Sequence, residues 1–228
     1  MKTVFLTLMF LLMTQSLYAG SITGKVTFDG DPLDFEEEIS MGADPTCMAA
    51  HDGEVYAETV IADASGGLKN VFAYLKEGVT GTHEAPADPA TIDQKGCMYS
   101  PHVFGMHVNQ DLKIVNSDNT LHNVHSLSEN SKQFNLGMPL QGMTLTKNFE
   151  ASEVMVKVKC DVHPWMNAYI GVVDHPYFAV SGDDGSFTID NVPAGDYVLE
   201  IWHEELGSQT QPITVADAAV TADFTLSG

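Results

Sequence analysis

The chain consists of short apolar stretches separated by polar turns, and this pattern predicts strands rather than helices. In Val154–Cys160 every second residue is apolar, so that three valines and Cys160 share one face while lysines occupy the other. Similar short runs recur between turn residues from 103 to 173, which is the pattern of an antiparallel sandwich. No long helix is indicated anywhere. We therefore expect an all-β protein.

The pattern also predicts how the chain is divided. A second set of short strands follows Pro176, but it is short for an independent sandwich. We expect Ile22–Phe28 to pair with it, and a separate C-terminal module is the alternative. Residues 77–93 and 134–141 are predicted as loops, the second near the candidate site. The predicted parts are a leader at residues 1–19, an N-terminal β segment at 20–66, a central domain at 67–177 and a C-terminal β module at 178–228.

The N-terminus has the features of a secretory signal. A positive Met1–Lys2 is followed by an apolar run at residues 4–13 and by a cleavage region that ends at Ala19. The run is too short to span a bilayer. No cysteine follows the cleavage region, so we expect no lipid anchor. The mature protein is therefore predicted to be exported, either into a bacterial periplasm or as a secreted protein.

Charge narrows the range of partners. The chain has 31 acidic residues against 10 basic ones, all of them lysine. Removal of Lys2 with the leader gives the mature chain a net charge of 9 − 31 = −22 with neutral histidines. Nucleic acids and anionic membranes are disfavoured, because both require positive charge on the protein. A basic protein partner is favoured, although acidity that serves only solubility is the alternative.

Three cysteines are an odd number for an exported chain. Cys47 and Cys97 lie in polar, turn-rich surroundings, and a disulfide between them leaves Cys160 as the single free thiol. We predict this Cys47–Cys97 bridge. The alternative is that one of the two joins a second metal site with His51 or His102.

The segment that follows the alternating strand combines three kinds of metal donor. Cys160, His163 and Met166 place a thiolate, an imidazole and a thioether in one short turn. Mononuclear blue-copper sites use one cysteine and two histidines with a weak axial methionine. Structural zinc sites instead collect four Cys or His ligands in paired spacings. The set favours copper, with a second histidine expected from an earlier loop. The alternative is a buried cysteine, a surface histidine and a methionine that fills the core.

Two histidines, His122 and His125, compete for the remaining position. In an extended segment their side chains point to opposite faces. His122 shares its face with Val124, whereas His125 shares its face with Asn123, so the apolar companion favours His122 as the ligand. Asn123 is then predicted to hold the ligand loop through a side-chain hydrogen bond.

These motifs resemble the cupredoxins, and most closely amicyanin and the plastocyanin-like proteins. The loop Cys160–Met166 is similar to the short ligand loop of amicyanin, with a proline after the histidine and an aromatic residue before the methionine. Leu121–His125 resembles the segment around amicyanin's first copper ligand. The resemblance spans roughly residues 70–175 and implies a Greek-key β-sandwich that binds one type 1 copper ion. It departs at Leu121, where a proline is common, and at Asp161–Val162. The implied ligands are His122, Cys160, His163 and Met166, supported by Asn123, Pro164 and Trp165.

A second resemblance covers Ser181–Leu199, which is similar to the carboxypeptidase regulatory-like, transthyretin-like domain. It implies a smaller β-sandwich with a structural or docking role and without peptidase activity. The combination resembles a bacterial group labelled methylamine-utilisation proteins.

Single-electron transfer between redox partners is the leading hypothesis. Cys160 would be the conduit and His163 the exposed edge, with Pro164 and Trp165 forming an apolar rim for brief docking. The expected partner is a protein with a basic docking surface, such as a cytochrome c or an oxidoreductase.

A copper carrier or sensor and an enzyme are the two other classes of function. A copper carrier or sensor is the alternative to electron transfer, supported by Met138 and Met143 near the site, although methionine is ordinary core material. An enzyme is not expected, because the ligand loop lacks a second cysteine and further His-rich copper motifs are missing from the sequence. Among the other histidines, His203 is the first candidate for an extra site.

Overall fold

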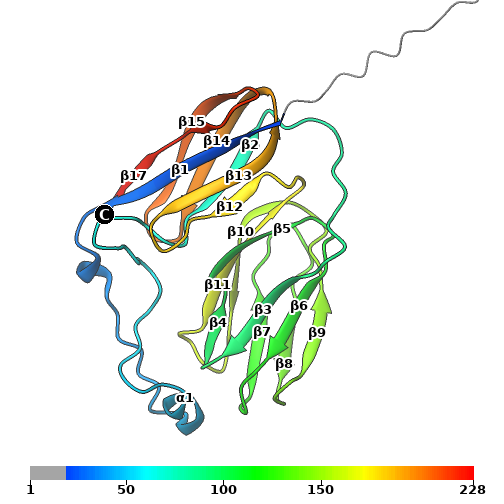
Figure 1. Cartoon of the computed structure of the whole chain (residues 1–228). Helices are drawn as coiled ribbons and strands as arrows, with labels where there is room; N and C mark the ends of the chain where they lie inside the picture. The colour runs from blue at the N-terminus through cyan, green and yellow to red at the C-terminus, as the bar shows by residue number, and fades with distance from the viewer. Residues whose placement is uncertain (1–18) are drawn as a thin grey trace, which may run out of the picture.

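The computed structural model describes residues 19–228, which form two β-sandwiches and a long irregular arm (Figure 1). Residues 1–18, which hold nearly all of the predicted leader, lie outside the described residues. Ala19 already belongs to the first strand. The described residues contain many strands and only two short helices, so the all-β prediction is confirmed.

The central sandwich consists of two sheets that face each other. One sheet has the order β5-β11-β10-β7-β8 and the other β4-β3-β6-β9. The strands are β3 (Ala90–Lys95), β4 (Met98–Ser100), β5 (Val103–His107), β6 (Leu112–Asn116), β7 (His122–Ser126), β8 (Asn135–Met138), β9 (Thr144–Lys147), β10 (Glu153–Lys159) and β11 (Asn167–Val173). Strand β3 lies partly in the predicted loop 77–93 and β8 within the predicted loop 134–141, and both of these loop predictions are wrong at those strands.

Alternating side chains fill the space between these sheets. Ile92 and Ile114 from one sheet meet Val124 and Val156 from the other, and all four are fully buried. Complete burial of such side chains stabilises the fold by about 1.5–3 kcal/mol each. Cys160 belongs to the same buried cluster. The alternation along the strand therefore places the Cys160 thiol among the buried apolar side chains of the central sandwich.

The terminal sandwich combines both ends of the described chain. Strand β1 pairs with β13, β16 and β17, and the facing sheet has the order β12-β2-β14-β15. The strands are β1 (Ala19–Asp29), β2 (Phe72–Glu77), β12 (Phe178–Val180), β13 (Ser186–Pro193), β14 (Gly195–His203), β15 (Gly207–Val215), β16 (Val220–Thr221) and β17 (Phe224–Ser227). The N-terminal segment thus pairs with the C-terminal strands.

Strand β2 differs from the predicted division. It lies in the range 67–177, but it pairs with β12 and β14 of the terminal sandwich. The sequence shows a strand here without showing its partner, because pairing depends on a strand more than 100 residues later, at 195–203. The central sandwich begins near β3 and is inserted between β2 and β12.

Phe72 joins the two sandwiches. Its ring lies over Gly171 of β11, where an added Cβ would be 2.3 Å from the ring, and also close to Gly105 of β5. The two glycines are register partners in neighbouring strands. Phe178 packs beside Phe72, with ring centroids 5.7 Å apart. The rings of Phe72 and Phe178 therefore pack directly on the backbone of these two glycines, which have no side chains.

The arm between β1 and β2 reaches the far end of the central sandwich (Figure 1). It contains the 3-10 helix η1 (Pro32–Phe35) and the helix α1 (Pro45–Ala49). Asp44 caps α1 by accepting hydrogen bonds from the amides of Thr46 and Cys47. Met41 and Cys47 are buried in the central core, so the arm is packed against the sandwich.

Candidate metal centre

The loop 160–166 joins two neighbouring antiparallel strands, β10 and β11. Its backbone is closed at the base, because the Cys160 amide donates to the Met166 carbonyl (3.0 Å) and the Met166 amide donates to the His163 carbonyl (3.0 Å). The His163 amide donates to Cys160 Sγ over 3.3 Å. All three side chains are buried, with Met166 fully so. The loop therefore folds its three donor residues inward.

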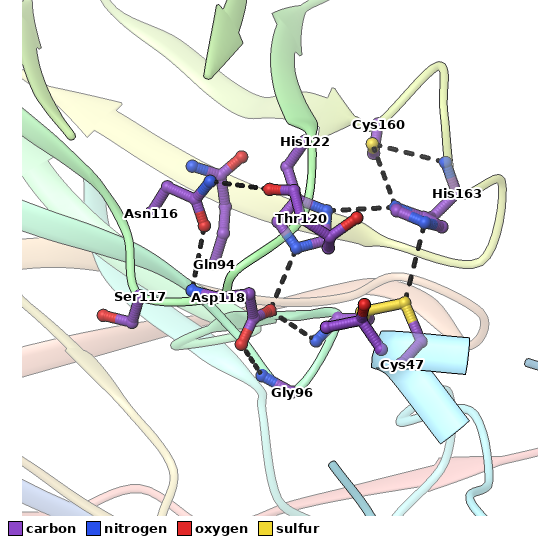
Figure 2. Close-up of polar contacts among 12 residues, drawn as sticks. Cys47, Gln94, Gly96, Asn116, Ser117, Asp118, Thr120, His122, Cys160 and His163 are labelled. Carbon is purple, nitrogen blue, oxygen red and sulfur yellow. Dashed lines mark hydrogen bonds and ion pairs between the residues drawn. A yellow bond between two sulfur atoms is a disulfide. The ribbon is translucent and has the colours of Figure 1, made fainter. Parts of the chain in front are cut away.

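The second histidine comes from the start of β7, which pairs with β10. His122 and Val124 are fully buried, whereas the His125 side chain is 26% exposed and contacts Asp161. His122 Nδ1 lies 3.0 Å from His163 Nδ1, and Cys160 Sγ lies 4.0 Å from the same His163 atom. Figure 2 shows the two rings pointing toward each other beside the sulfur. The structure thus brings His122 to the loop and leaves His125 outside.

The donor set fits a copper ion. One ligand atom from each of His122, Cys160 and His163 lies within 4.8 Å of the others. Two facing Nδ1 atoms can share one proton, but when both are deprotonated their lone pairs are best satisfied by a cation between them. Imidazole nitrogen with soft sulfur suits copper. Met166 is fully buried in the same cluster as Cys160, and a thioether is a further soft donor.

Electrostatics favour a thiolate here. Burial raises the pKa of Cys160, but His122 and the backbone amides of Asn123, His163 and Val162 outweigh it and lower the pKa. Burial lowers the pKa of His122, but hydrogen bonds with Asp118 and Cys160 outweigh it and raise the pKa to about 9. Both shifts favour the charged forms of the pair. A metal cation that binds would displace the protons from the donor atoms.

Asn123 contacts the loop through both ends of its amide. Its Oδ1 accepts hydrogen bonds from the Asp161 amide (2.7 Å) and from Cys160 Sγ (3.3 Å). Its Nδ2 donates to Asp161 Oδ2 of the loop over 3.2 Å and to Asn135 Oδ1 of β8 over 2.7 Å. Asn123 therefore links β7, β8 and the start of the loop, which is the position that the alternation pattern suggested for it.

Pro164 and Trp165, the other two residues predicted to support the site, differ in exposure. Pro164 is exposed. Trp165 is half-buried, its ring lies tilted against that of His163 with centroids 5.1 Å apart, and its Nε1 donates to the Cys97 carbonyl (3.0 Å). Trp165 thus links the loop 160–166 to the β3–β4 turn. Because its side chain is half-buried, it exposes less apolar surface for docking than the sequence predicted.

The predicted disulfide is confirmed, since Cys47 and Cys97 are bonded. Among the described residues Cys160 is the only free cysteine. The alternative second metal site on these cysteines is excluded, because both sulfurs are in the bridge. His51 instead contacts the Gly96 carbonyl, and His102 pairs with Glu204.

The prediction that His163 forms an exposed edge is wrong. The residue is only 3% exposed. Its Nε2 lies 3.1 Å from Asp44 Oδ2 and 3.6 Å from Cys47 Sγ, both in the arm. The arm covers the imidazole because the disulfide fixes α1 over it. Nothing in the local sequence of the loop reveals this cover.

Asp44 and Asp118 are site residues that the sequence analysis missed. Asp118 Oδ2 lies 2.9 Å from His122 Nε2. Burial raises the pKa of Asp44, but hydrogen bonds from Thr46, Thr120 and His163 outweigh it and lower the pKa to about 2. The position of Asp118 in the turn directly before His122 was a usable signal. Asp44 is 119 positions from His163 and offered none.

His203 is buried, and no partner for its Nε2 exists among the described residues. Its Nδ1 accepts the amides of Glu205 and Leu206 over 3.3 Å each. Burial lowers the pKa of His203 to about 4, so the ring is neutral. His203 is absent from the groups of described residues that could hold a metal.

Comparison with known proteins gives partial likenesses. The family model "Polysaccharide lyase family 4, domain II" matches residues 150–223, which is less than half of the chain. This match runs from the ligand strands into the terminal sandwich and leaves the transthyretin-like resemblance unconfirmed. No curated protein matches this chain.

Several solved structures resemble part of the chain. A copper-containing nitrite reductase (NirK) from Thermus scotoductus SA-01 is 19% identical, with a TM-score of 0.35, over 42% of this chain and 25% of its own. A purple cupredoxin from Nitrosopumilus maritimus is 27% identical, with a TM-score of 0.31, over 36% of this chain and 98% of its own. A reduced amicyanin variant is 17% identical, with a TM-score of 0.33, over 44% of this chain and 97% of its own.

The chain thus spans a quarter of the nitrite reductase. These are likenesses to cupredoxin folds, and a metal in this chain is inferred from its own side chains. None of the helices in residues 19–228 has the length and apolar character needed to cross a membrane.

Proposed function

We propose that this protein is a mononuclear type 1 copper protein of the periplasm that carries single electrons between redox partners. The observation that carries the proposal is the convergence of His122 and His163 Nδ1 atoms, 3.0 Å apart, on the buried Cys160 thiol. Two distant parts of the chain supply these groups, and both are held by strand pairing. His122, Cys160, His163 and Met166 would hold the ion.

Bound copper would supply one-electron chemistry by cycling between its two oxidation states. The chain's own contribution is rigidity and dryness. Strands β7, β10 and β11 fix three of the donors, and Asn123 bonds the loop where it leaves β10. Full burial of His122 and Met166 keeps water away from the donors. Such a pocket would hold its donor atoms in one arrangement in both oxidation states, which would keep the reorganisation energy of electron transfer small.

Charge supports a basic redox partner. The mature chain would carry 9 − 31 = −22, which attracts a basic cytochrome c or oxidoreductase and speeds encounter. The arm lies between His163 and solvent, so this partner would dock against the arm or near the exposed Pro164 rather than on the imidazole. The apolar run at residues 4–13 supports export to the periplasm.

The test is to add copper(II) to the purified protein. We expect an intense blue or purple colour and an electron paramagnetic resonance spectrum with the narrow hyperfine splitting of a copper–thiolate bond. Cys160→Ala should abolish both while leaving the fold intact, because a small buried side chain remains. His125→Ala should keep them, because His125 lies outside the cluster. A colourless copper complex in the unmodified protein would exclude the proposal.

Met138 and Met143 give little support to the alternative that the protein is a copper carrier or sensor. Met138 is fully buried in the core, and its sulfur accepts a hydrogen bond from Gln94 over 3.1 Å. Met143 also packs against this core. Both therefore serve packing. A reversible midpoint potential and fast exchange with a basic cytochrome favour electron transfer, whereas copper release to a chelating protein favours the carrier.

A further inference from the structure

Each of the two histidines carries a carboxylate on the side of its ring that faces away from the thiol. His122 Nε2 lies 2.9 Å from Asp118 Oδ2, and His163 Nε2 lies 3.1 Å from Asp44 Oδ2. A carboxylate only accepts, so each Nε2 must carry the proton. Once a metal displaces the remaining ring proton, each Nδ1 is the nitrogen whose lone pair is free. The two Nδ1 atoms lie 3.0 Å apart beside Cys160 (Figure 2).

Asp118 is held by the β3–β4 turn. Its two carboxylate oxygens accept the amides of Gly96 and Cys97, each over 2.8 Å. Both turn residues have positive φ, 64° for Gly96 and 55° for Cys97. Positive φ is uncommon for a residue with a side chain. The turn therefore directs two adjacent amides at this carboxylate, and their hydrogen bonds hold the Asp118 side chain in place.

Asp44 is held in the same way from the arm. Its oxygens accept the amides of Thr46 (2.7 Å) and Cys47 (3.4 Å) and the hydroxyl of Thr120 (3.0 Å). Thr120 lies two residues before His122. The Cys47–Cys97 bridge covalently joins the residues whose amides hold the two carboxylates. The two His–Asp pairs thus belong to one frame around the donor atoms.

We propose that Asp44 and Asp118 are positioning residues that set the tautomer of both metal-binding histidines and favour copper(II) over copper(I). This inference rests on the proposed function. Each carboxylate orients a ring and makes its Nδ1 a stronger donor. Two negative charges beside the ligands stabilise a dication more than a monocation, most strongly where water is excluded. The frame therefore lowers the reduction potential of the site.

The variants Asp44→Asn and Asp118→Asn keep the shape of each side chain and remove its charge. We expect each to weaken copper(II) binding about tenfold more than copper(I) binding, within the range found for residues that support metal ligands. A tenfold change corresponds to a midpoint potential about 59 mV higher. Asp161→Asn is the matched control: it removes a charge next to Cys160 from a side chain that bonds His125, Asn135 and Asn123 but neither ligand ring. It should shift the potential much less.

A second readout does not depend on electron transfer. In the diamagnetic copper(I) form, ¹⁵N NMR should show a solvent-protected Nε2–H on both His122 and His163. Asp44→Ala should remove only the His163 signal, and Asp118→Ala only the His122 signal. If Asp118 variants fail to fold because the turn is lost, the Asp44 pair of variants still decides the question.

The outcomes separate the two proposals. Failure of the unmodified protein to form a copper–thiolate would overturn the function and this inference together. A normal copper–thiolate whose potential changes equally in the Asp44, Asp118 and Asp161 variants would overturn the inference alone. Protonated Nδ1 atoms in the copper(I) form would do the same.

Discussion

The Cys47–Cys97 bridge is the covalent link between the arm and the central sandwich, and its removal makes a quantitative prediction. The two cysteines are 50 positions apart. In the chain-entropy model a closed loop of this size contributes about 4 kcal/mol to the free energy of unfolding. For a chain of this length each kcal/mol corresponds to about 2–4 °C. The double variant Cys47→Ser/Cys97→Ser should therefore melt about 8–16 °C lower.

The same variant should open the site locally. Helix α1 has five residues, far fewer than the ~12–15 that make an isolated helix even marginally stable. Without the bridge, the arm is held near the site by Asp44 and by burial of Met41. We expect α1 to detach frequently and His163, now 3% exposed, to become accessible to water.

Hydrogen–deuterium exchange of the metal-free protein measures this opening. The amides of residues 46–51 should lose protection in the double variant, while those of β14 should lose protection only in line with the global loss of stability. Electron exchange of the copper-loaded variant with a basic cytochrome should become faster. Unchanged protection at residues 46–51 together with an unchanged melting temperature would refute the reasoning, because the arm would then be held by its noncovalent contacts alone.

Three further predictions concern the site, the interface and the charge. Met166→Leu should retain copper but raise the midpoint potential, because a thioether is lost; an unchanged potential in voltammetry would exclude Met166 as a ligand. Gly171→Ala should cost about 1–3 kcal/mol in urea unfolding, because the new Cβ would be 2.3 Å from Phe72, whereas Gly137→Ala, which would meet no described atom within 4 Å, should be nearly neutral. Electron exchange with a basic cytochrome should slow as salt rises, and a rate independent of salt would contradict steering.

The local pattern predicted the ligand strand well, because alternation fixes which face of a strand is buried. Val156, Val158 and Cys160 are buried while Lys157 is exposed. The same reasoning separated His122 from His125. In each case a residue's fate depends on its immediate neighbours, and those are visible in the sequence.

Strand β3 was not predicted, because the burial of its side chains depends on partners that are distant in the sequence. It alternates Ile92 and Gln94 on the buried side with polar residues, and a buried glutamine looks like a loop residue in the sequence. Gln94 is fully buried because its amide donates to the Val115 carbonyl over 2.8 Å and to Met138. Its partners come from β6 and β8, which local pattern does not reveal.

The cover over His163 could not be predicted from the sequence for the same physical reason. Asp44 meets His163 across 119 positions, and only the folded arm brings them together. The disulfide was predictable by pairing the cysteines. The burial of His163 that follows from it was not predictable, because it depends on where the bridge lies relative to the loop 160–166.

The contact between Phe72 and the glycine pair bears on how this architecture can be altered. The central sandwich leaves the terminal one after β2 and returns at β12, and these two strands pair with each other. The two points where the chain enters and leaves the central sandwich are therefore adjacent, which is the arrangement that allows one inserted domain to be replaced by another. A sandwich of another sequence could be grafted at these points only if it brought two glycines side by side in neighbouring strands, since a Cβ at either position would clash with the Phe72 ring.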